Sequence, residues 1–307
     1  MARLADDSLA TLLLTSRLVD SAAPVLKASD YWALAARVDL AGLLGADETP
    51  LVADFGEQMA ARVVALLDRA GALAFALEEL EQQGVRAIAA TDPEYPPRWR
   101  SRLGTAAPPH LHLAGSTALL AEPAVGIVGS RDLAPAAVEI AQRAARFAAT
   151  QGRAVVSGGA RGTDAIAMHA TLDAEGHVVG ILADALVRAA RSSDLRNAVL
   201  DERLALATPY APTAPFSVGN AMGRNKLIYA LADVTLVVAS DLDTGGTWSG
   251  AKEALAKGYG PVAVWRGEGE GPGNARLVEL GASPLRDVET MFEGSSASQT
   301  EQLDLGL

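Results

Sequence analysis

Residues 7–80 place apolar side chains at helical spacing. Leu, Ala and Glu dominate the stretches DSLATLLLTSRLV, DYWALAARV and QMAARVVALLDRAGALAFALEELEQQG. Apolar residues that recur every three to four positions form one stripe along a helix. The last stretch ends at Gly84, a residue that suits the position just after a helix C-terminus. We therefore expect a small helical domain over residues 1–80.

From residue 124 the pattern changes to short apolar runs that alternate with amphipathic segments. We expect strands at AVGIVGS, AVVSGG, HVVGILA, VTLVVAS and PVAVW, and helices at PAAVEIAQRAARFAATQG, TDAIAMHATLDAEG, NKLIYALA and GAKEALAKG. Continuous apolar strands joined through helices are typical of a parallel sheet covered on both faces. The sequence thus predicts an α/β fold, and such sheets bind ligands beyond the carboxyl ends of their strands.

A proline-rich segment joins the two regions. VRAIAA (85–90) predicts a short strand, whereas prolines prevent long helices in DPEYPPRW (92–99) and TAAPPHLHLAG (105–115). We assign residues 81–290 to the sheet domain. The remaining residues, 291–307, are rich in Ser and Gln and predict a flexible tail.

Composition narrows the class of protein. No apolar run reaches the roughly 18–20 residues of a membrane span, and the acidic start MARLADDS lacks the basic region of a signal peptide. The chain has no cysteine, which excludes disulfides, thiolate nucleophiles and cysteine zinc sites, and with 4 histidines a metal centre would rest on carboxylates. We expect a cytoplasmic protein with no metal site and no membrane contact.

The net charge of −11 argues against a nucleic-acid ligand, because phosphates require a positive footprint. The charge is unevenly spread, however. Residues 1–80 carry 6 basic and 12 acidic residues, whereas residues 121–290 carry 16 and 19. For the binding of an anionic ligand, the local electrostatic field in a groove matters more than the total charge of the chain.

The first informative loop is GIVGSRDLAP (126–135), where Gly129, Ser130 and Arg131 end a strand before a helix. Exposed N–H groups at a helix start attract anions, and Arg131 adds a bidentate charge. The alternative is a plain turn with a surface arginine.

The second loop, SGGARGTDAIAMHA (157–170), allows a tight backbone nest before a helix that carries Arg161 near its start. Thr163 or Asp164 is the expected N-cap of that helix, which makes Asp164 structural rather than catalytic. We expect His169 to be packed or hydrogen-bonded rather than a ligand. Neither the dinucleotide fingerprint G-x-G-x-x-G nor the P-loop ending is present.

The third loop, GNAMGRNKLIYALAD (219–233), gathers Arg224, Asn225 and Lys226 at an expected helix start. Two cations and an amide suit a phosphate, although a solvated helix end explains the spacing equally well. In the fourth loop, TGGTWSGAKEALAKG (244–258), Trp248 either stacks on a base or packs against the sheet. Because all four loops follow strands, we expect them to converge on one rim that fits an extended anionic ligand.

These residues resemble the DprA/Smf family of bacterial DNA-processing proteins over roughly residues 8–290. The similar motifs are VGIVGSR, VVSGGARGTDAIAMHATL, GRNKLIYALADVTLVV, GGTWSGAKEALAKG and GNARLVELGA, preceded by DPEYPP and PPHLHLAG. They occur in the order and at the spacing typical of the family.

The resemblance implies an extended Rossmann-like fold that binds single-stranded DNA without catalytic residues or a cofactor. It also implies a homodimer, a role in DNA recombination or natural transformation, and a RecA-type recombinase as partner. The residues expected to contact DNA phosphates are Gly129, Ser130, Arg131, Ser157, Gly158, Gly159, Arg161, Gly162, Arg224, Asn225, Lys226, Gly245, Gly246, Thr247 and Lys252.

The chain departs from the family pattern between residues 184 and 223. ADALVRAARSSDLRN replaces the usual Tyr-Pro region, ATPYAP replaces Ser-Glu-Tyr-Pro, and AMG stands where Phe-Pro often precedes Arg-Asn. Arg188, Arg191 and Arg196 either add charge to the groove or form a solvated helix face. The family's C-terminal winged-helix domain is not in this sequence, and QLDLGL (Gln302–Leu307) resembles the peptides that bind the sliding clamp.

Two other classes of function stay open at this point. One is an enzyme that hydrolyses nucleoside monophosphates, with TGGTWSGAKE as its loop and Glu253 as the candidate acid. The other is a sensor that binds a small nucleotide and signals through the helical domain.

Overall fold

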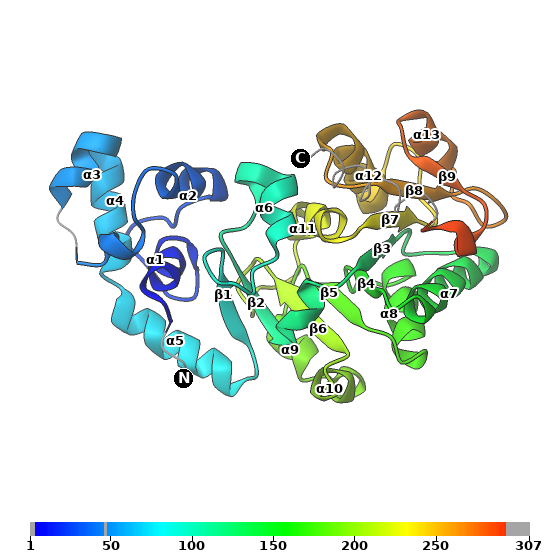
Figure 1. The fold of residues 1–307 in the computed structure, drawn as a ribbon, viewed down its shortest axis with the longest axis horizontal. Coiled ribbons are helices and arrows are strands. Elements are labelled where there is room, and N and C mark those ends of the chain that lie inside the picture. Colours follow the sequence, from blue (N-terminus) through cyan, green and yellow to red (C-terminus); the bar gives the residue numbers. More distant parts are fainter. Residues whose placement is uncertain (1–3, 46–47, 293–307) are drawn as a thin grey trace, which may run out of the picture.

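The computed structural model describes residues 4–45 and 48–292. The chain begins with helices that lie together at one end of the molecule, at the left of Figure 1. Their bounds are α1 (Asp6–Thr15), α2 (Ala28–Ala35), the 3-10 turn η1 (Ala41–Leu43), α3 (Glu48–Phe55), α4 (Glu57–Leu67) and α5 (Ala70–Gln82). A core of leucines joins them, including Leu14, Leu34 and Leu66.

A nine-stranded sheet forms the rest of the molecule, in the order β1-β2-β6-β5-β4-β3-β7-β8-β9. The strands from β6 to β9 in this order are parallel, and β2 runs antiparallel to both β1 and β6. The strands are β1 (Arg86–Ala89), β2 (His110–Gly115), β3 (Ala124–Val128), β4 (Ala154–Ser157), β5 (Val178–Ile181), β6 (Leu204–Thr208), β7 (Val234–Val237), β8 (Val262–Trp265) and β9 (Ser283–Leu285).

The strand order reverses between β3 and β7, which are neighbours in the sheet but far apart in the chain. Loops that leave these two strands diverge to opposite faces and open a crevice at the carboxyl ends. This arrangement confirms the predicted α/β class with an extended Rossmann-like sheet.

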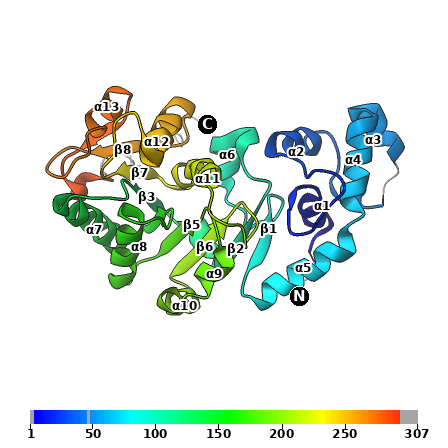
Figure 2. The ribbon, with the colours of Figure 1, turned by 180° about the vertical axis from the view of Figure 1, so that it is seen from behind.

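Helices cover both faces of the sheet (Figures 1 and 2). One face packs against α7 (Pro135–Thr150), α8 (Thr163–Asp173), α9 (Leu186–Ala190) and α10 (Ser193–Leu200). The other face packs against α6 (Pro97–Leu103), α11 (Val218–Leu231), α12 (Gly245–Lys257) and α13 (Asn274–Glu279). Strands covered on both faces need apolar side chains at every position, and all five residues of β3 are buried.

The helical part docks on the antiparallel edge of the sheet. The Ser8 hydroxyl of α1 donates to the Asp92 carboxylate, and the Thr15 hydroxyl lies 2.9 Å from Nδ1 of His110. Arg69 is 8% exposed and its guanidinium donates to carbonyls after α1, including those of Val19 at 3.0 Å and Ser16 at 2.8 Å. Polar contacts therefore hold α1 against both its own domain and the sheet.

Two helix starts differ from the predictions. The helix expected at residue 225 begins at Val218, where the Ser217 hydroxyl caps it by accepting from the Asn220 N–H at 3.0 Å. Its first two turns contain Gly219 and Gly223, and because glycine has a low helix propensity, the sequence did not predict a helix there. The N-cap of α8 is Gly162 at φ 82°, so the prediction of Thr163 or Asp164 at that position is wrong.

No helix in the described part of the chain is long and apolar enough to cross a membrane. Residues 293–307 of the predicted tail, with the clamp-like peptide Gln302–Leu307, lie outside the described residues, whereas Met291 at the start of that tail is buried and packs in the core.

Candidate nucleic-acid interface

A crevice with a volume of about 490 Å³ lies at the carboxyl ends of β3 and β7, where the strand order reverses. It opens between α11, α12 and the loop that follows β3, elements that lie to the right of the centre in Figure 1. Eight of the predicted contact residues line it, namely Gly129, Ser130, Arg131, Arg224, Asn225, Gly245, Gly246 and Thr247. All four predicted loops therefore meet at this site, the second through Ala160 and Asp164.

Arg224 forms the floor of the crevice and is 5% exposed. Its Nη1 lies 4.0 Å from Oδ2 of Asp164. Gly158 makes room for the guanidinium, because a Cβ at this position would lie 1.6 Å from Nη1. The same Asp164 oxygen accepts from the N–H groups of Gly158 at 3.1 Å and Ala160 at 3.4 Å. Asp164 is thus structural, as expected, but it fixes the turn before α8 instead of capping the helix.

Burial dominates the electrostatics of this pair. It lowers the pKa of Arg224, with Asp164 opposing, and it raises the pKa of Asp164, with Arg224 and the two backbone N–H groups opposing. Within the described residues, Nε of Arg224 is buried without a hydrogen-bond partner. A buried N–H without an acceptor costs about 1–3 kcal/mol, so a ligand oxygen that reached it would be stabilised.

The loop after β3 packs closely on the turn after β4. The Thr163 hydroxyl donates to the Ser130 carbonyl at 3.1 Å, and the Thr163 N–H does so at 3.2 Å. A Cβ on Gly129 would lie 2.4 Å from the Thr163 hydroxyl, and one on Gly162 would lie 2.4 Å from the Arg131 carbonyl. These two glycines are required by close approach of the loops.

The rim of the crevice carries a cation above an aromatic ring. Arg131 is exposed, and its Cζ lies 5.7 Å from the centroid of the Phe216 ring. Phe216 also lines the crevice and is 51% exposed. Phe216 was not predicted, because a lone Phe between a proline and a serine belongs to no periodic pattern.

The opposite wall is the N-terminus of α12. Thr244 precedes the helix, and Gly245, Gly246 and Thr247 line the crevice with its first turn. The first N–H groups of a helix lack intrahelical acceptors and carry partial positive charge. The Asn225 side chain donates to the Gly246 carbonyl at 3.1 Å and ties this wall to α11.

A second residue that the sequence analysis missed holds the loop after β7. Asn274 is fully buried; its Oδ1 accepts from the Ser240 N–H at 2.9 Å. Its Nδ2 donates to the carbonyls of Val238 and Trp265, both at 2.9 Å. The Asn274 side chain therefore joins β7, β8 and the crevice loop. Asn274 is the second residue of the GNARLVELGA motif.

The other predicted contact residues do not line the crevice. Ser157 is buried and its hydroxyl donates to the Ile127 carbonyl at 2.7 Å. Gly158, Gly159 and Gly162 belong to the turn beneath Arg224, whereas Arg161 is exposed beside it. Lys226 lines a different cavity across α11, and Lys252 lies on the surface of α12.

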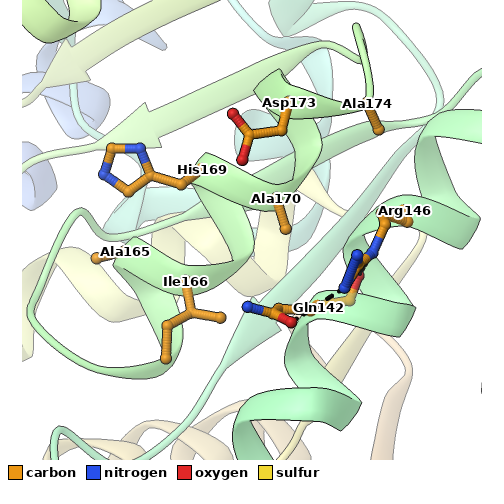
Figure 3. Close-up of a pocket in the computed structure, with 8 residues that line it drawn as sticks. All are labelled: Gln142, Arg146, Ala165, Ile166, His169, Ala170, Asp173 and Ala174. Carbon is orange, nitrogen blue, oxygen red and sulfur yellow. Dashed lines mark hydrogen bonds between the residues drawn. The ribbon is translucent and has the colours of Figure 1, made fainter.

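Two aromatic predictions have clear outcomes. Trp248 is 4% exposed and packs in the core, where it cannot stack on a base. His169 was expected in a packed setting, but it is exposed and lies on the outer face of α8 beside Asp173 (Figure 3). The depression there has a volume of about 410 Å³ and an apolar floor that includes Ile166 and Ala170.

The structure also bears on the enzyme alternative. Glu253 lies outside the crevice lining, and its carboxylate accepts from the Tyr259 hydroxyl at 3.0 Å. In the described part of the chain, no group of three or more His, Cys, Asp or Glu residues could hold a metal ion.

The fold and the crevice define a doubly wound α/β protein with a crevice at its switch point. The sequence profile of the family described as "DNA recombination-mediator protein A" matches residues 86–296. The chain belongs to this family, which confirms the resemblance found in its motifs. No curated protein matches the chain.

Two solved structures show the same fold at low sequence identity. DNA processing protein A (DprA) from Streptococcus pneumoniae is 19% identical with a TM-score of 0.68, and the match covers 95% of this chain and 98% of that one. DNA processing protein A from Helicobacter pylori is 22% identical with a TM-score of 0.56 and covers 71% and 96%. The latter structure is described in terms of its single-stranded DNA binding mode.

Proposed function

We propose that this protein binds single-stranded DNA in the crevice at the β3–β7 switch point and acts there as a recombination mediator without catalysis. The observation that carries the proposal is Arg224, which lines the crevice and whose buried Nε has no hydrogen-bond acceptor among the described residues. The exposed guanidinium of Arg131 and the first turn of α12 supply further donors to an anion. None of these groups is a nucleophile or a general base.

A strand fits this site better than a mononucleotide or a DNA duplex. The half-exposed ring of Phe216 offers a face on which a base can stack, and a single strand presents unpaired bases. Residues of four loops and of α11 line the crevice, which is more than one phosphate group needs. The family membership and the DNA-binding relative from Helicobacter pylori support the same ligand.

The wider role is part of the same proposal, and the family membership supports it. We assign to this protein a place in DNA recombination during natural transformation, in the cytoplasm, as a homodimer with a RecA-type recombinase as partner. Contact with the sliding clamp would use Gln302–Leu307. Pull-down of a recombinase on oligonucleotide-coated beads, with and without this protein, tests the partner separately from DNA binding.

Fluorescence anisotropy with labelled oligonucleotides tests the binding itself. Each phosphate contact adds about 0.7 to the slope of log affinity against log salt for single strands. Arg131→Ala should therefore weaken binding and lower the slope by about 0.7. Arg286→Ala removes an exposed arginine outside the crevice and should change neither the affinity nor the slope. Undetectable binding of the unaltered protein at about 50 mM salt would contradict the proposal.

A further inference from the structure

A second cavity opens on the other side of α11, at the same edge of the sheet. It has a volume of about 480 Å³ and lies where β6 ends, β2 begins and the segment after α1 approaches. We call it the junction pocket, because residues of the helical part and of the sheet domain line it together. Its polar lining residues are Thr15, Arg17, His110, Tyr210, Asn220 and Lys226.

The charge of the junction pocket is opposite to that of the chain. Arg17 and Lys226 line it, and no Asp or Glu among the described residues does so, although the chain has 37 acidic and 26 basic residues. The crevice, by comparison, is lined by Asp132, Asp164 and Asp241 as well as by its two arginines. The junction pocket is therefore the more cationic of the two cavities.

Both cations are available to a ligand. Arg17 is exposed, and within the described residues the side chains of Arg17 and Lys226 have neither a hydrogen bond nor an ion pair. Burial lowers the pKa of Lys226, while Glu253 opposes this from a distance. The Glu253 carboxylate is already hydrogen-bonded to the Tyr259 hydroxyl. An anion in the junction pocket would supply the counter-charge that these side chains lack.

The two cavities lie on opposite sides of one helix. Arg224, Asn225 and Ile228 of α11 line the crevice, whereas Asn220, Gly223 and Lys226 line the junction pocket. A helix with its side chains is about 10–12 Å across, and a stacked strand rises about 3.4 Å per nucleotide. A strand that occupies the crevice thus needs about three more nucleotides to cross the α11 ridge.

We propose that the junction pocket binds a phosphate of the same single strand that occupies the crevice, with Arg17 and Lys226 as its ligands. The inference rests on the proposed function and deepens it, since it assigns the strand a path along the carboxyl edge of the sheet. It also makes the helical part a DNA contact, through Arg17 in the segment after α1.

The test compares oligothymidylates of increasing length, from about four nucleotides upward, on the full chain. The unaltered protein should gain affinity once the oligonucleotide is long enough to cross α11. The variant Arg17→Gln/Lys226→Gln should bind the shortest oligonucleotides normally and lose this gain. For long ones its salt slope should fall by about 1.4, which is about sevenfold in affinity between 50 and 200 mM salt. The pair Lys257→Gln/Arg286→Gln removes two exposed cations outside both cavities and should leave the length dependence unchanged.

The outcomes separate the two proposals. If short and long oligonucleotides both bind but the Arg17→Gln/Lys226→Gln variant keeps the full gain, the strand path is wrong and the crevice proposal stands. If the pocket binds dTMP or inorganic phosphate while the length dependence is unaltered, it is a free-anion site and the strand path is again overturned. If no oligonucleotide binds the unaltered protein, both proposals fail. The variant Lys226→Met preserves the aliphatic stem and covers the case in which Lys226→Gln does not fold.

Discussion

The histidine pair on β2 predicts a loss of stability in mild acid. His110 and His112 are 7% and 1% exposed, and their rings meet edge to face with centroids 5.2 Å apart. Burial, together with the neighbouring His112, lowers the pKa of His110 to about 3, and burial lowers the pKa of His112 to about 4. The His112 Nδ1 lies 2.9 Å from the Tyr210 carbonyl, while its Nε2 is buried without a partner in the described part of the chain.

The direction in which the free energy of unfolding changes with pH depends on whether the folded or the unfolded state binds more protons. Below a pKa of about 6.5 the unfolded chain protonates both rings, whereas the folded protein keeps them neutral. The free energy of unfolding therefore falls as the pH drops from about 6.5 towards 4, and it is insensitive to these groups above neutral pH. At pH 5 each ring contributes a loss of about 2 kcal/mol, since one pKa unit corresponds to about 1.36 kcal/mol. The pair together removes about 4 kcal/mol from a typical total of about 5–15 kcal/mol.

Urea unfolding at pH 7 and pH 5 measures this loss. His112→Gln should lower the stability at pH 7, because a packed ring is removed, yet it should shrink the difference between the two pH values by about 2 kcal/mol. His169→Gln changes an exposed histidine and serves as the matched control. An equal pH dependence in the unaltered protein and in His112→Gln would refute the assigned neutrality of the pair.

Two further substitutions test the packing that builds the site and its support. Gly158→Ala should displace Arg224, leave a buried carboxylate uncompensated and destabilise the protein by about 3–5 kcal/mol in thermal or urea unfolding. Gly71→Ala, where a Cβ meets nothing within 4 Å, should instead be neutral or stabilising by up to about 1 kcal/mol. Arg69→Met should lower stability by about 3 kcal/mol, because it leaves buried carbonyls after α1 without donors. Unchanged urea midpoints would contradict either destabilising prediction.

Much of the sheet was predictable because buried parallel strands leave a clear signature. The runs at β3, β4, β5, β7 and β8 are apolar on both faces, and the helices between them are amphipathic. The run LALAT of β6 was not predicted, since it follows two turn residues and precedes a proline in a region that departs from the family. The antiparallel strand β2 was not predicted either, since it begins with a histidine and follows two prolines.

The site was predicted in its location but not in every residue. Parallel strands bring their following loops to one edge, so Gly129–Arg131 and Gly245–Thr247 met as expected. The sequence analysis placed Arg224, Asn225 and Lys226 together because the helix was expected to begin there. In the middle of a helix, successive residues instead point about 100° apart, and Lys226 faces the junction pocket. Because the start of α11 was predicted too late in the sequence, Lys226 was assigned to the crevice although it lines the junction pocket.

The same geometry resolves the conflict between an acidic chain and an anionic ligand. Net charge sets the long-range field, but a strand experiences the groups that line its path. Arg131 at the crevice and Arg17 and Lys226 at the junction pocket have no ion-pair partner among the described residues. The acidic remainder of the surface then repels a strand that leaves this path, and screening by salt weakens repulsion and attraction alike. Of the two cavities, the junction pocket is lined by cations without an acidic residue among those described, whereas Asp132, Asp164 and Asp241 line the crevice beside its two arginines. The acidic remainder of the chain therefore favours a strand held at the junction pocket over diffuse binding.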